Sequence, residues 1–503
     1  MGTSKVTQPL DGVRVVDLSR GISGPYCTKL LADFGADVIK VERAGTGDYA
    51  RQMGPFPGDV PHDEKSGLFL HLNTNKRSIV VDLKSDGGVE LVKELVRGAD
   101  VLVENFRPGV MKSLGLDYAT LEKVNPNLVM TSVSNFGQTG PYRDYLASEL
   151  TLFGMGNRMH SLGLPDRFPL RLGGNHVQYQ AGNVGAMTTL FALQGRDQKE
   201  MGGQHIDISI FETQTGSFNM RMPSLLQYAY TGERGKRLGG MRMGYPSGVY
   251  PCLDGNVLMT GGGGFWPRTV AMLLDNNVAP ELVEDPRFAP PMGQLDLDAK
   301  EEFEGTIWLP FVLERTKDEL SELCQSWEVP CTPISGIDDV MDSSPQFGAR
   351  KYWTTIEHPE VGKVRHTGAP IFNTHGWWDI RRPTPLLGEH NDDVLQGDLG
   401  YSQEDAGRIG KGDATERSAK PLPSPVSTRT GWEGEVKLPL DGIRVMDITL
   451  VFQGPYGTMF LADMGADVIR VESLNVFPST TRGQSARPTK EAEAAAPSSR
   501  YPN

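Results

Sequence analysis

Long hydrophobic runs are absent from this chain of 503 residues. No stretch of about 18 apolar residues occurs, which is the length that a membrane-spanning helix needs. The first residues, MGTSKVTQPLDG, lack the apolar core of a secretory signal. Hydrophobic residues make up 38% of the chain and charged residues 22%, as in ordinary globular proteins. We therefore expect a cytoplasmic protein with two or more folding units that does not bind membranes.

Cysteine and positive charge are also scarce. The four cysteines, Cys27, Cys252, Cys324 and Cys331, have no metal-ligand spacing, so we expect buried reduced thiols and no metal site. Lys and Arg number 50 against 63 Asp and Glu, which gives a formal net charge of −13. This balance argues against a nucleic-acid-binding surface, and an anionic ligand would need a locally basic site.

One stretch near the start of the chain occurs a second time near its end. Pro9–Glu42 and Pro439–Glu472 lie 430 positions apart and are identical at 21 of 34 positions. The segment 402–438 between them is rich in Pro, Ser, Gly and charge, and we interpret it as a linker. We interpret residues 439–503 as the start of a second, truncated copy of the large domain.

The repeated stretch predicts a strand, a glycine-containing turn, a helix and a second strand. In the first copy the strands are Val13–Leu18 and Asp37–Glu42, and the helix opens with Pro25 at its first position. A dinucleotide site has this outline but requires G-x-G-x-x-G, and only Gly21 and Gly24 are present. The pattern therefore argues against a nicotinamide site.

Strand and helix patterns continue to alternate along the chain. The further expected elements are strands at 78–83, 100–104, 128–133 and 205–210 and helices at 88–97, 109–114 and 179–194. This alternation predicts an α/β fold with a Rossmann-like parallel sheet that binds ligands at the carboxyl ends of its strands. Gly- and Met-rich sequence after Pro223 indicates a smaller α+β domain. We place the large domain at 9–222, the small domain at 223–355 and a return to the large domain at 356–401.

Several stretches resemble the family III CoA transferases, which include formyl-CoA transferase, carnitine CoA-transferase and alpha-methylacyl-CoA racemase. In order, they are PLDGVRVVDLSRGISGPYCTKLLADFGADVIKVE, LNTNKRSIVVDLK, VLVENFRPGVMKSLGL, SVSNFGQTGPY, GGQHIDISIFET and APIFN with TPLLGEHNDDVL. The resemblance covers about residues 9 to 400. It implies a Rossmann-like large domain, a smaller domain and two subunits that interlock as a dimer. Some members are fused pairs, and this chain resembles the first half of such a fused two-copy member.

Residues in these stretches are candidates for binding coenzyme A, whose 3′-phosphate and diphosphate need cations and backbone donors. By residue type and placement, the candidates are Lys40, Arg43, Lys76, Arg107 and Lys112. Each of them could instead be a solvated surface charge. The resemblance implies contacts along the nucleotide from Leu72, Lys76, Asn105 and Phe106, and along the pantetheine arm from Gly21, Ser23 and Gly24. It implies no permanently bound cofactor, because coenzyme A and acyl-CoA are substrates.

The catalytic position departs from the family pattern. Members carry an aspartate in the motif D-x-x-x-G ahead of a Gly/Ala-rich helix, and this carboxylate forms an acyl anhydride with the thioester. The corresponding segment, LGGNHVQYQAGNVGAM, has Gln178 four residues before Gly182. A neutral amide cannot form that anhydride. Either the motif is aligned here in the wrong register, or this half lacks the nucleophile and carries Gln178 in its place.

Other residues could supply the missing chemistry. Glu149 matches, by resemblance, a glutamate near the active site of formyl-CoA transferase and could assist proton transfer. Asp166 stands in a predicted turn, where a structural role is expected. His176 could serve the proton abstraction of a racemase, but the G-H-D stretch of that branch is missing here. The glycines Gly239 and Gly240 are our candidates for the hinges of a lid over the site.

The sequence thus predicts a CoA transferase that moves CoA between an acyl-CoA thioester and a carboxylic acid. One alternative is a CoA-thioester-binding half, or scaffold, without activity of its own. Another is an acyl-CoA racemase or isomerase. The expected partners are the two substrates and a second subunit in a homodimer, or a missing second half in a pseudo-dimer.

Overall fold

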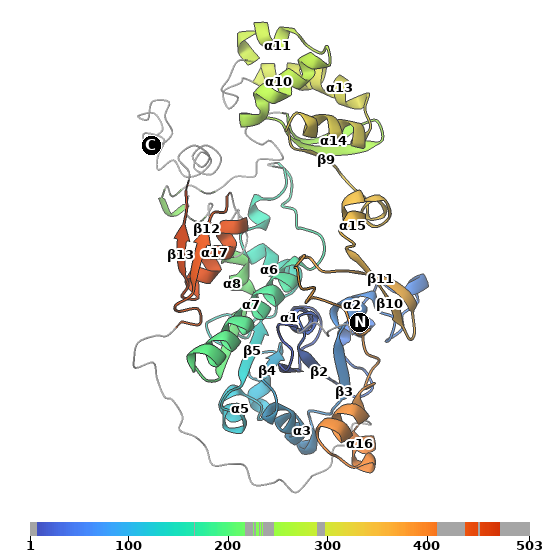
Figure 1. Cartoon of the computed structure of the whole chain (residues 1–503), viewed down its shortest axis with the longest axis vertical. Coiled ribbons are helices and arrows are strands. Elements are labelled where there is room, and N and C mark those ends of the chain that lie inside the picture. The colour runs from blue at the N-terminus through green and yellow to red at the C-terminus, as the bar shows by residue number, and fades with distance from the viewer. Residues whose placement is uncertain are drawn as a thin grey trace. The chain divides into compact units, whose positions relative to one another are not determined.

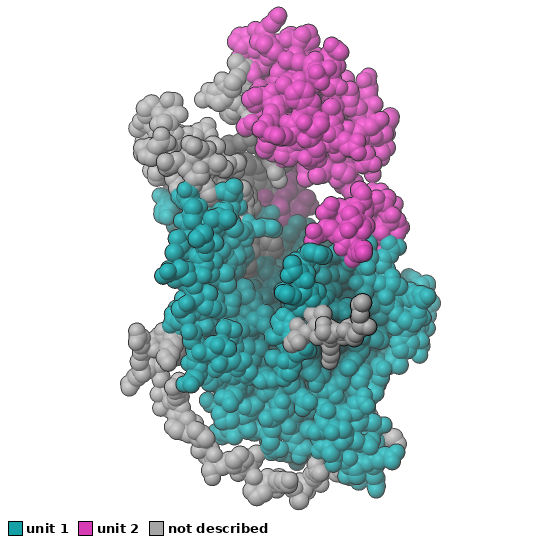
Figure 2. All heavy atoms as spheres, in the orientation of Figure 1, with its two compact units in different colours: residues 1–159, 171–235, 352–503 teal, residues 160–170, 236–351 magenta. Residues whose placement is uncertain are grey.

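The computed structural model describes residues 8–164, 166–216, 225, 228–230, 232, 234, 246–288, 297–409, 438–450 and 453–472. The chain divides into two compact units, coloured teal and magenta in Figure 2. Unit 1 comprises residues 1–159, 171–235 and 352–503, and unit 2 comprises residues 160–170 and 236–351. The boundaries expected from the sequence were 223 and 356. Within the described ranges, no helix is long and apolar enough to cross a membrane.

Unit 1 is built on a six-stranded parallel sheet with the strand order β3-β2-β1-β4-β5-β6. Its strands are β1 (Arg14–Asp17), β2 (Asp37–Glu42), β3 (Lys76–Val80), β4 (Val101–Glu104), β5 (Val129–Ser134) and β6 (Gln204–Ser209). The chain runs outward from β1 to β3, crosses to the other side of β1, and runs outward again from β4 to β6 (Figure 1). The direction of strand addition therefore reverses between β1 and β4.

Helices cover both faces of this sheet. They are α1 (Ser23–Asp33), α2 (Gly67–Leu72), α3 (Asp86–Arg97), α4 (Val110–Ser113), α5 (Tyr118–Val124), α6 (Glu149–Met155), α7 (His176–Lys199) and α8 (Ile210–Gly216). Side chains alternate along the strands, so Val15 and Val103 join a core with α1 and α7. Val16 and Leu102 join the opposite core with α3 and α5. Because both faces are covered, β4 and β5 are buried along their whole length, whereas the edge strand β6 is partly exposed.

The later part of unit 1 returns to the sheet and covers its β3 edge. After the antiparallel hairpin of β10 (Trp353–His358) and β11 (Gly362–Thr367), the backbone N–H of His390 donates to the carbonyl of Ser78 at 2.9 Å. The N–H of Val80 donates to Asn391 Oδ1, also at 2.9 Å. Backbone groups of an otherwise open edge strand are thereby paired. Helix α16 (Gln403–Ile409) follows.

Unit 2 has its own antiparallel sheet and its own core. Its elements are β7 (Ser247–Cys252), β8 (Gly255–Thr260), α10 (Trp266–Asp275), α11 (Glu281–Glu284), α12 (Leu297–Glu302), α13 (Leu309–Leu313), α14 (Lys317–Ser326), β9 (Cys331–Pro333) and α15 (Pro345–Ala349). Trp266, Phe303 and Trp308 lie at the centre of the core. The expected α+β composition is confirmed, and all four cysteines of the chain are buried and free of disulfides, also as expected.

The repeated sequence folds in the same way both times. We call residues 9–42 the first corner and residues 439–472 the second corner. The second corner contains β12 (Arg444–Asp447), α17 (Gln453–Asp463) and β13 (Asp467–Arg470). In both corners the two strands are parallel, and the register of β12 on β13 is that of β1 on β2 displaced by 430 residues.

The strands and helices expected in the large domain are present, with some ends displaced. Strand β3 begins at Lys76 and ends at Val80, not at 78 and 83 as predicted, and α7 extends beyond 179–194 at both ends. The prediction that α1 opens at Pro25 is wrong, because the helix begins two residues earlier at Ser23. Proline is tolerated in the whole first turn, where its missing N–H has no helical partner. Helices α2, α5, α6 and α8 were not predicted.

Candidate active site

The reversal of strand order between β1 and β4 makes the carboxyl ends of these two strands the switch point of the sheet. In open α/β sheets this switch point is where ligands bind. The turn Ser19–Ile22 follows β1 and leads into α1, and Asn105 and Phe106 follow β4. The candidate residues Gly21, Ser23, Gly24, Asn105 and Phe106 therefore lie at one edge of the sheet.

Side chains around the β1 turn hold its backbone in place. Asp17 Oδ1 accepts a hydrogen bond from the Ser19 N–H at 2.9 Å, and Asp48 Oδ1 accepts one from the Gly21 N–H at 2.8 Å. Gly21 has a φ of +78°, and a Cβ atom there would collide with the hydroxyl of Tyr49. The turn therefore requires glycine at this position.

Lys40 and Lys76 lie inside the protein behind this turn, and their side chains are 0% exposed. Lys76 Nζ is 3.1 Å from Asp17 Oδ2 and 2.9 Å from the Pro25 carbonyl oxygen, and Lys40 Nζ is 2.9 Å from Asp48 Oδ2. Burial alone would raise the pKa of Asp17, but the two lysines and its hydrogen bonds lower it to about 2. These lysines brace the turn, and their contact with CoA stays a prediction.

Asn105 joins the two sides of the switch point. Its Oδ1 accepts a hydrogen bond from the Arg20 N–H at 2.8 Å, and its Nδ2 donates one to the Arg20 carbonyl at 2.7 Å. The neighbouring Phe106 N–H donates to Glu104 Oε2 at 2.7 Å. Burial raises the pKa of Glu104 to about 7, although hydrogen bonds from Ser132 and Phe106 oppose the rise. The carboxyl end of β4 is thus fixed by polar contacts on both sides.

The remaining nucleotide candidates differ in exposure. Leu72 is 0% exposed and belongs to the core. Arg43, Arg107 and Lys112 are exposed, and Arg107 Nη2 lies 3.4 Å from the carbonyl of Asp144. Only the exposed side chains can reach a ligand in solvent without a rearrangement of the core.

The start of α7, which carries Gln178, packs directly on the start of α1. A Cβ atom at Gly182 would lie only 2.6 Å from the carbonyl oxygen of Ser23. The rings of Tyr26 and Tyr179 meet edge to face, with centroids 4.8 Å apart. The glycine four residues after Gln178 is therefore explained by the close approach of the two backbones.

Glu149 reaches the same end of α7. Asn175, the residue before the helix, makes no side-chain cap, but Glu149 Oε1 accepts a hydrogen bond from the Val177 N–H at 3.0 Å. Its Oε2 is buried and has no hydrogen-bond partner among the described residues. Burial raises the pKa of the Glu149 carboxyl, opposed by the backbone N–H groups of Val177 and Gln178. The structure thus brings two predicted catalytic residues, Glu149 and Gln178, to one helix end.

Other predicted features are less informative. Gly239 and Gly240 lie outside the described residues. His176 is the exposed first residue of α7. Across the described part of the chain, no group of three or more His, Cys, Asp or Glu side chains is placed to hold a metal ion.

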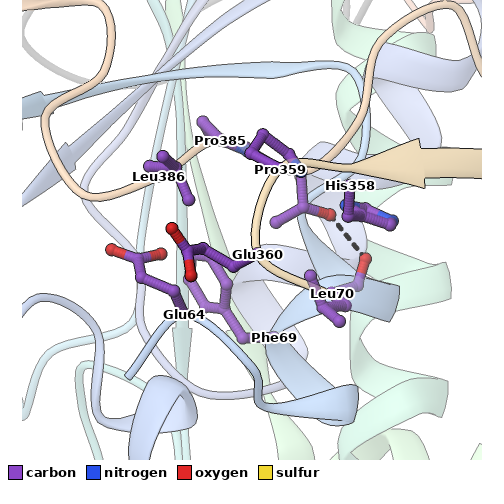
Figure 3. A pocket seen from close by; sticks show the side chains of 9 residues that line it. Glu64, Phe69, Leu70, His358, Pro359, Glu360, Pro385 and Leu386 are labelled. Carbon is purple, nitrogen blue, oxygen red and sulfur yellow. Dashed lines mark hydrogen bonds between the residues drawn. The ribbon is translucent and has the colours of Figure 1, made fainter. Parts of the chain in front are cut away.

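Two hollows in unit 1 are lined by residues other than those of the switch point. Figure 3 shows a cavity of about 10 Å³, which has room for little more than one water molecule. It is lined by Glu64, Phe69, Leu70, His358, Pro359, Glu360, Thr384, Pro385 and Leu386. A more open hollow of about 470 Å³ includes Asp63 and Glu64, whose charges disfavour an anionic ligand such as CoA. Neither hollow includes a predicted site residue.

Comparison with known proteins identifies the family to which this arrangement belongs. A sequence profile described as CoA-transferase family III matches residues 10–391 and 440–499. This chain belongs to CoA-transferase family III. The predicted resemblance and fold class are therefore confirmed, and relatives in this family move CoA between an acyl-CoA thioester and a carboxylic acid.

Individual relatives of this CoA-transferase cover most of the chain. A succinyl-CoA–D-citramalate CoA-transferase of Chloroflexus aurantiacus is 34% identical over 80% of this chain and 98% of its own length. A succinate–glutarate CoA-transferase of Agrobacterium fabrum is 33% identical over 77% of this chain and 95% of its own. The crystal structure of a CAIB/BAIF family protein from Brucella suis is 31% identical, with a TM-score of 0.68 over 78% of this chain and 99% of that one.

Asp17, Asp48 and Glu104 hold the backbone around the switch point, and none of them was predicted from the sequence. A signal was present for two of them, because Asp17 ends β1 in the stretch VVDL and Glu104 ends β4 in VLVEN, whereas Asp48 lies six residues beyond β2. Adjacent parallel strands bring their carboxyl ends to one edge. Lys40 and Lys76 pair with Asp48 and Asp17, and the sequence alone does not show these pairs.

Proposed function

We propose that this CoA-transferase moves CoA from a succinyl-CoA-type thioester to a dicarboxylic acid. Two relatives that cover more than three quarters of the chain are named for succinyl-CoA with D-citramalate and for succinate with glutarate. Another, from Afipia carboxidovorans, is named for formyl-CoA and oxalate, and it is 31% identical over 80% of this chain. The acids in these names carry two carboxylates, so a dicarboxylate acceptor is the class that we expect.

The contact of α7 with the start of α1 is the observation that carries this proposal. A CoA thioester bound at the switch point would extend its pantetheine arm along Gly21, Ser23 and Gly24. Because Gly182 approaches the Ser23 carbonyl so closely, the start of α7 lies beside that path. The thioester would then be presented to the helix end that carries Gln178 and is capped by Glu149.

Transfer through this site needs a carboxylate nucleophile. A carboxylate oxygen attacks the thioester carbonyl carbon, the C–S bond breaks, and CoA leaves as a thiolate with the bonding electron pair. The acyl group remains on the protein as an anhydride. The amide of Gln178 cannot do this, and Glu149 is our candidate because its Oε2 is unpartnered among the described residues.

A binding protein without transfer activity is the second candidate function, and Gln178 favours it. In that case the chain holds CoA thioesters at the switch point, and the chemistry takes place on another polypeptide. The interlocked dimer implied by the family resemblance, or a pseudo-dimer with a second half, belongs to both versions of the proposal.

The test is CoA transfer by the purified full chain. Succinyl-CoA is mixed with citramalate, glutarate or oxalate, CoA thioester products are measured, and hydroxylamine traps any anhydride for mass spectrometry. We expect transfer, an adduct at Glu149, and a loss of roughly 10³-fold or more in Glu149→Gln. The variant Gln178→Asp should add a second adduct at position 178, whereas Gln180→Asp on the same helix should not.

Different outcomes separate the candidates. Binding of CoA thioesters without transfer by the native chain, followed by transfer in Gln178→Asp, would establish the binding function and reject Glu149 as the nucleophile. No binding of CoA thioesters by any variant would reject both candidate functions.

A further inference from the structure

Arg20 occupies a fixed position at the switch point. It follows β1 in the turn, and both of its backbone polar groups are held by the one amide side chain of Asn105, at 2.8 and 2.7 Å. Asn105 itself follows β4, on the other side of the switch point. The backbone of Arg20 is therefore positioned by both strands that flank the ligand-binding point of the sheet, while its side chain is exposed.

The guanidinium of Arg20 is oriented and available. Its Cζ lies 5.1 Å from the ring centroid of Phe106, within the range of a cation–π contact. The backbone of Phe106 is held by the hydrogen bond from its N–H to Glu104 Oε2. Among the described residues, no carboxylate forms an ion pair with Arg20 and neutralises its charge. An unpaired cation of fixed geometry at this point suits an anionic ligand.

The surrounding charges lead to the same ligand class. Two of the nearby cations, Lys40 and Lys76, are buried and engaged by Asp48 and Asp17, whereas Arg107, the residue after Phe106, is exposed. Glu104 is the carboxyl closest to the Phe106 backbone, and burial keeps a share of it protonated near neutral pH. The carboxylates Asp17 and Asp48 at the switch point are paired with these lysines, so little uncompensated negative charge there opposes a phosphate.

We infer that Arg20 binds a phosphate group of coenzyme A, with the Phe106 ring beneath the guanidinium. The inference rests on the proposed function, in which CoA thioesters are bound at the switch point. A guanidinium can donate two parallel hydrogen bonds to one phosphate, whereas the point charge of a lysine cannot reproduce that geometry. Arg20 thus replaces the two buried lysines as the phosphate ligand of the nucleotide.

The test is equilibrium binding by calorimetry with the full chain and three ligands: CoA, 3′-dephospho-CoA and pantetheine. We expect Arg20→Ala to weaken CoA binding roughly tenfold or more, and Arg20→Lys to recover part of the loss. Pantetheine, which has no nucleotide, should bind as it does to the native chain. The matched control is Arg97→Ala, which removes an exposed arginine at the end of α3. Thermal unfolding of each variant checks that the fold is retained.

Each result is decisive. A loss for CoA but not for 3′-dephospho-CoA assigns Arg20 to the 3′-phosphate, and an equal loss for both assigns it to the diphosphate. Unchanged binding of CoA by Arg20→Ala would overturn the inference while leaving the proposed function intact, and so would an equal loss for pantetheine. If the native chain binds none of the three ligands, the proposed function fails, and the inference fails with it.

Discussion

The first and second corners place the same carboxylate in two different settings. Asp17 and its counterpart Asp447 both have a pKa lowered to about 2. For Asp17, burial opposes this shift and Lys76 and Lys40 overcome it. For Asp447, hydrogen bonds from Thr449 and Thr458 are the main cause, and Arg470 contributes less. The two carboxyls therefore have a similar pKa for different reasons. The cause is a charge cluster in the first corner and a local turn in the second.

The two corners differ more in what surrounds them. Val16 and Ile39 of the first corner are 0% exposed, whereas their counterparts Met446 and Ile469 are 71% and 45% exposed. Strands β3 and β4 flank the first corner, and in the described residues β12 and β13 pair only with each other. The local sequence is thus sufficient for the strand–helix–strand shape and its register. Burial and the charge cluster depend on neighbouring strands.

Replacing the shared carboxylate should break the comparison most strongly. Asp17→Asn leaves Lys76 buried without its partner, and we expect a loss of about 3–5 kcal/mol in the free energy of unfolding. Asp447→Asn should lower the melting temperature much less, because Arg470 is 32% exposed and water screens its charge. Calorimetric unfolding of both variants gives the comparison.

A compensating variant controls this result. Asp17→Asn combined with Lys76→Met removes both charges of the buried pair and should recover part of the lost stability. If Asp17→Asn and Asp447→Asn lower the free energy of unfolding equally, the neighbouring strands do not determine how much this carboxylate contributes to stability.

Glu104 lies on β4, and the described part of the second corner has no counterpart of this strand. The dependence of stability on pH that Glu104 causes is therefore expected for the first corner alone. Its carboxyl keeps its proton up to about pH 7 in the folded chain, against an ordinary pKa of 4.5. Unfolding between these values releases the proton, so rising pH favours unfolding. Glu104→Gln should remove a stability loss of up to about 3 kcal/mol between pH 4.5 and 7.

The measurement for Glu104 is the melting temperature of the native chain and the variant across that pH range. Glu90→Gln, which changes a carboxylate that is 54% exposed on α3, serves as the control and should follow the native curve. A native-like pH dependence in Glu104→Gln would show that another group is responsible.

The sequence was sufficient for the sheet but not for the polar contacts of the site. Strand and helix periods are local, so the elements of the large domain could be predicted to within a few residues. Lys76 and Asp17, however, lie 59 residues apart and meet only through strand order, so the sequence could not show that the lysine is buried in an ion pair. The cap of α7 by Glu149 likewise joins residues 28 positions apart. The departure at Gln178 could be recognised from the sequence because the motif D-x-x-x-G fixes its position four residues before Gly182.

The smallest predicted effect tests whether the exposed face of the second corner is free in solution. Val16→Ala should cost about 2 kcal/mol, because it leaves a cavity in a filled core. Met446→Ala, at the equivalent position, should change stability by no more than about 0.5 kcal/mol, since the side chain is largely in water. Denaturant unfolding of both variants at several protein concentrations makes the comparison. A loss in Met446→Ala that approaches that of Val16→Ala, and grows with protein concentration, would mean that another copy of the chain covers this face. The two corners would then differ in burial within a single chain but not within the assembly.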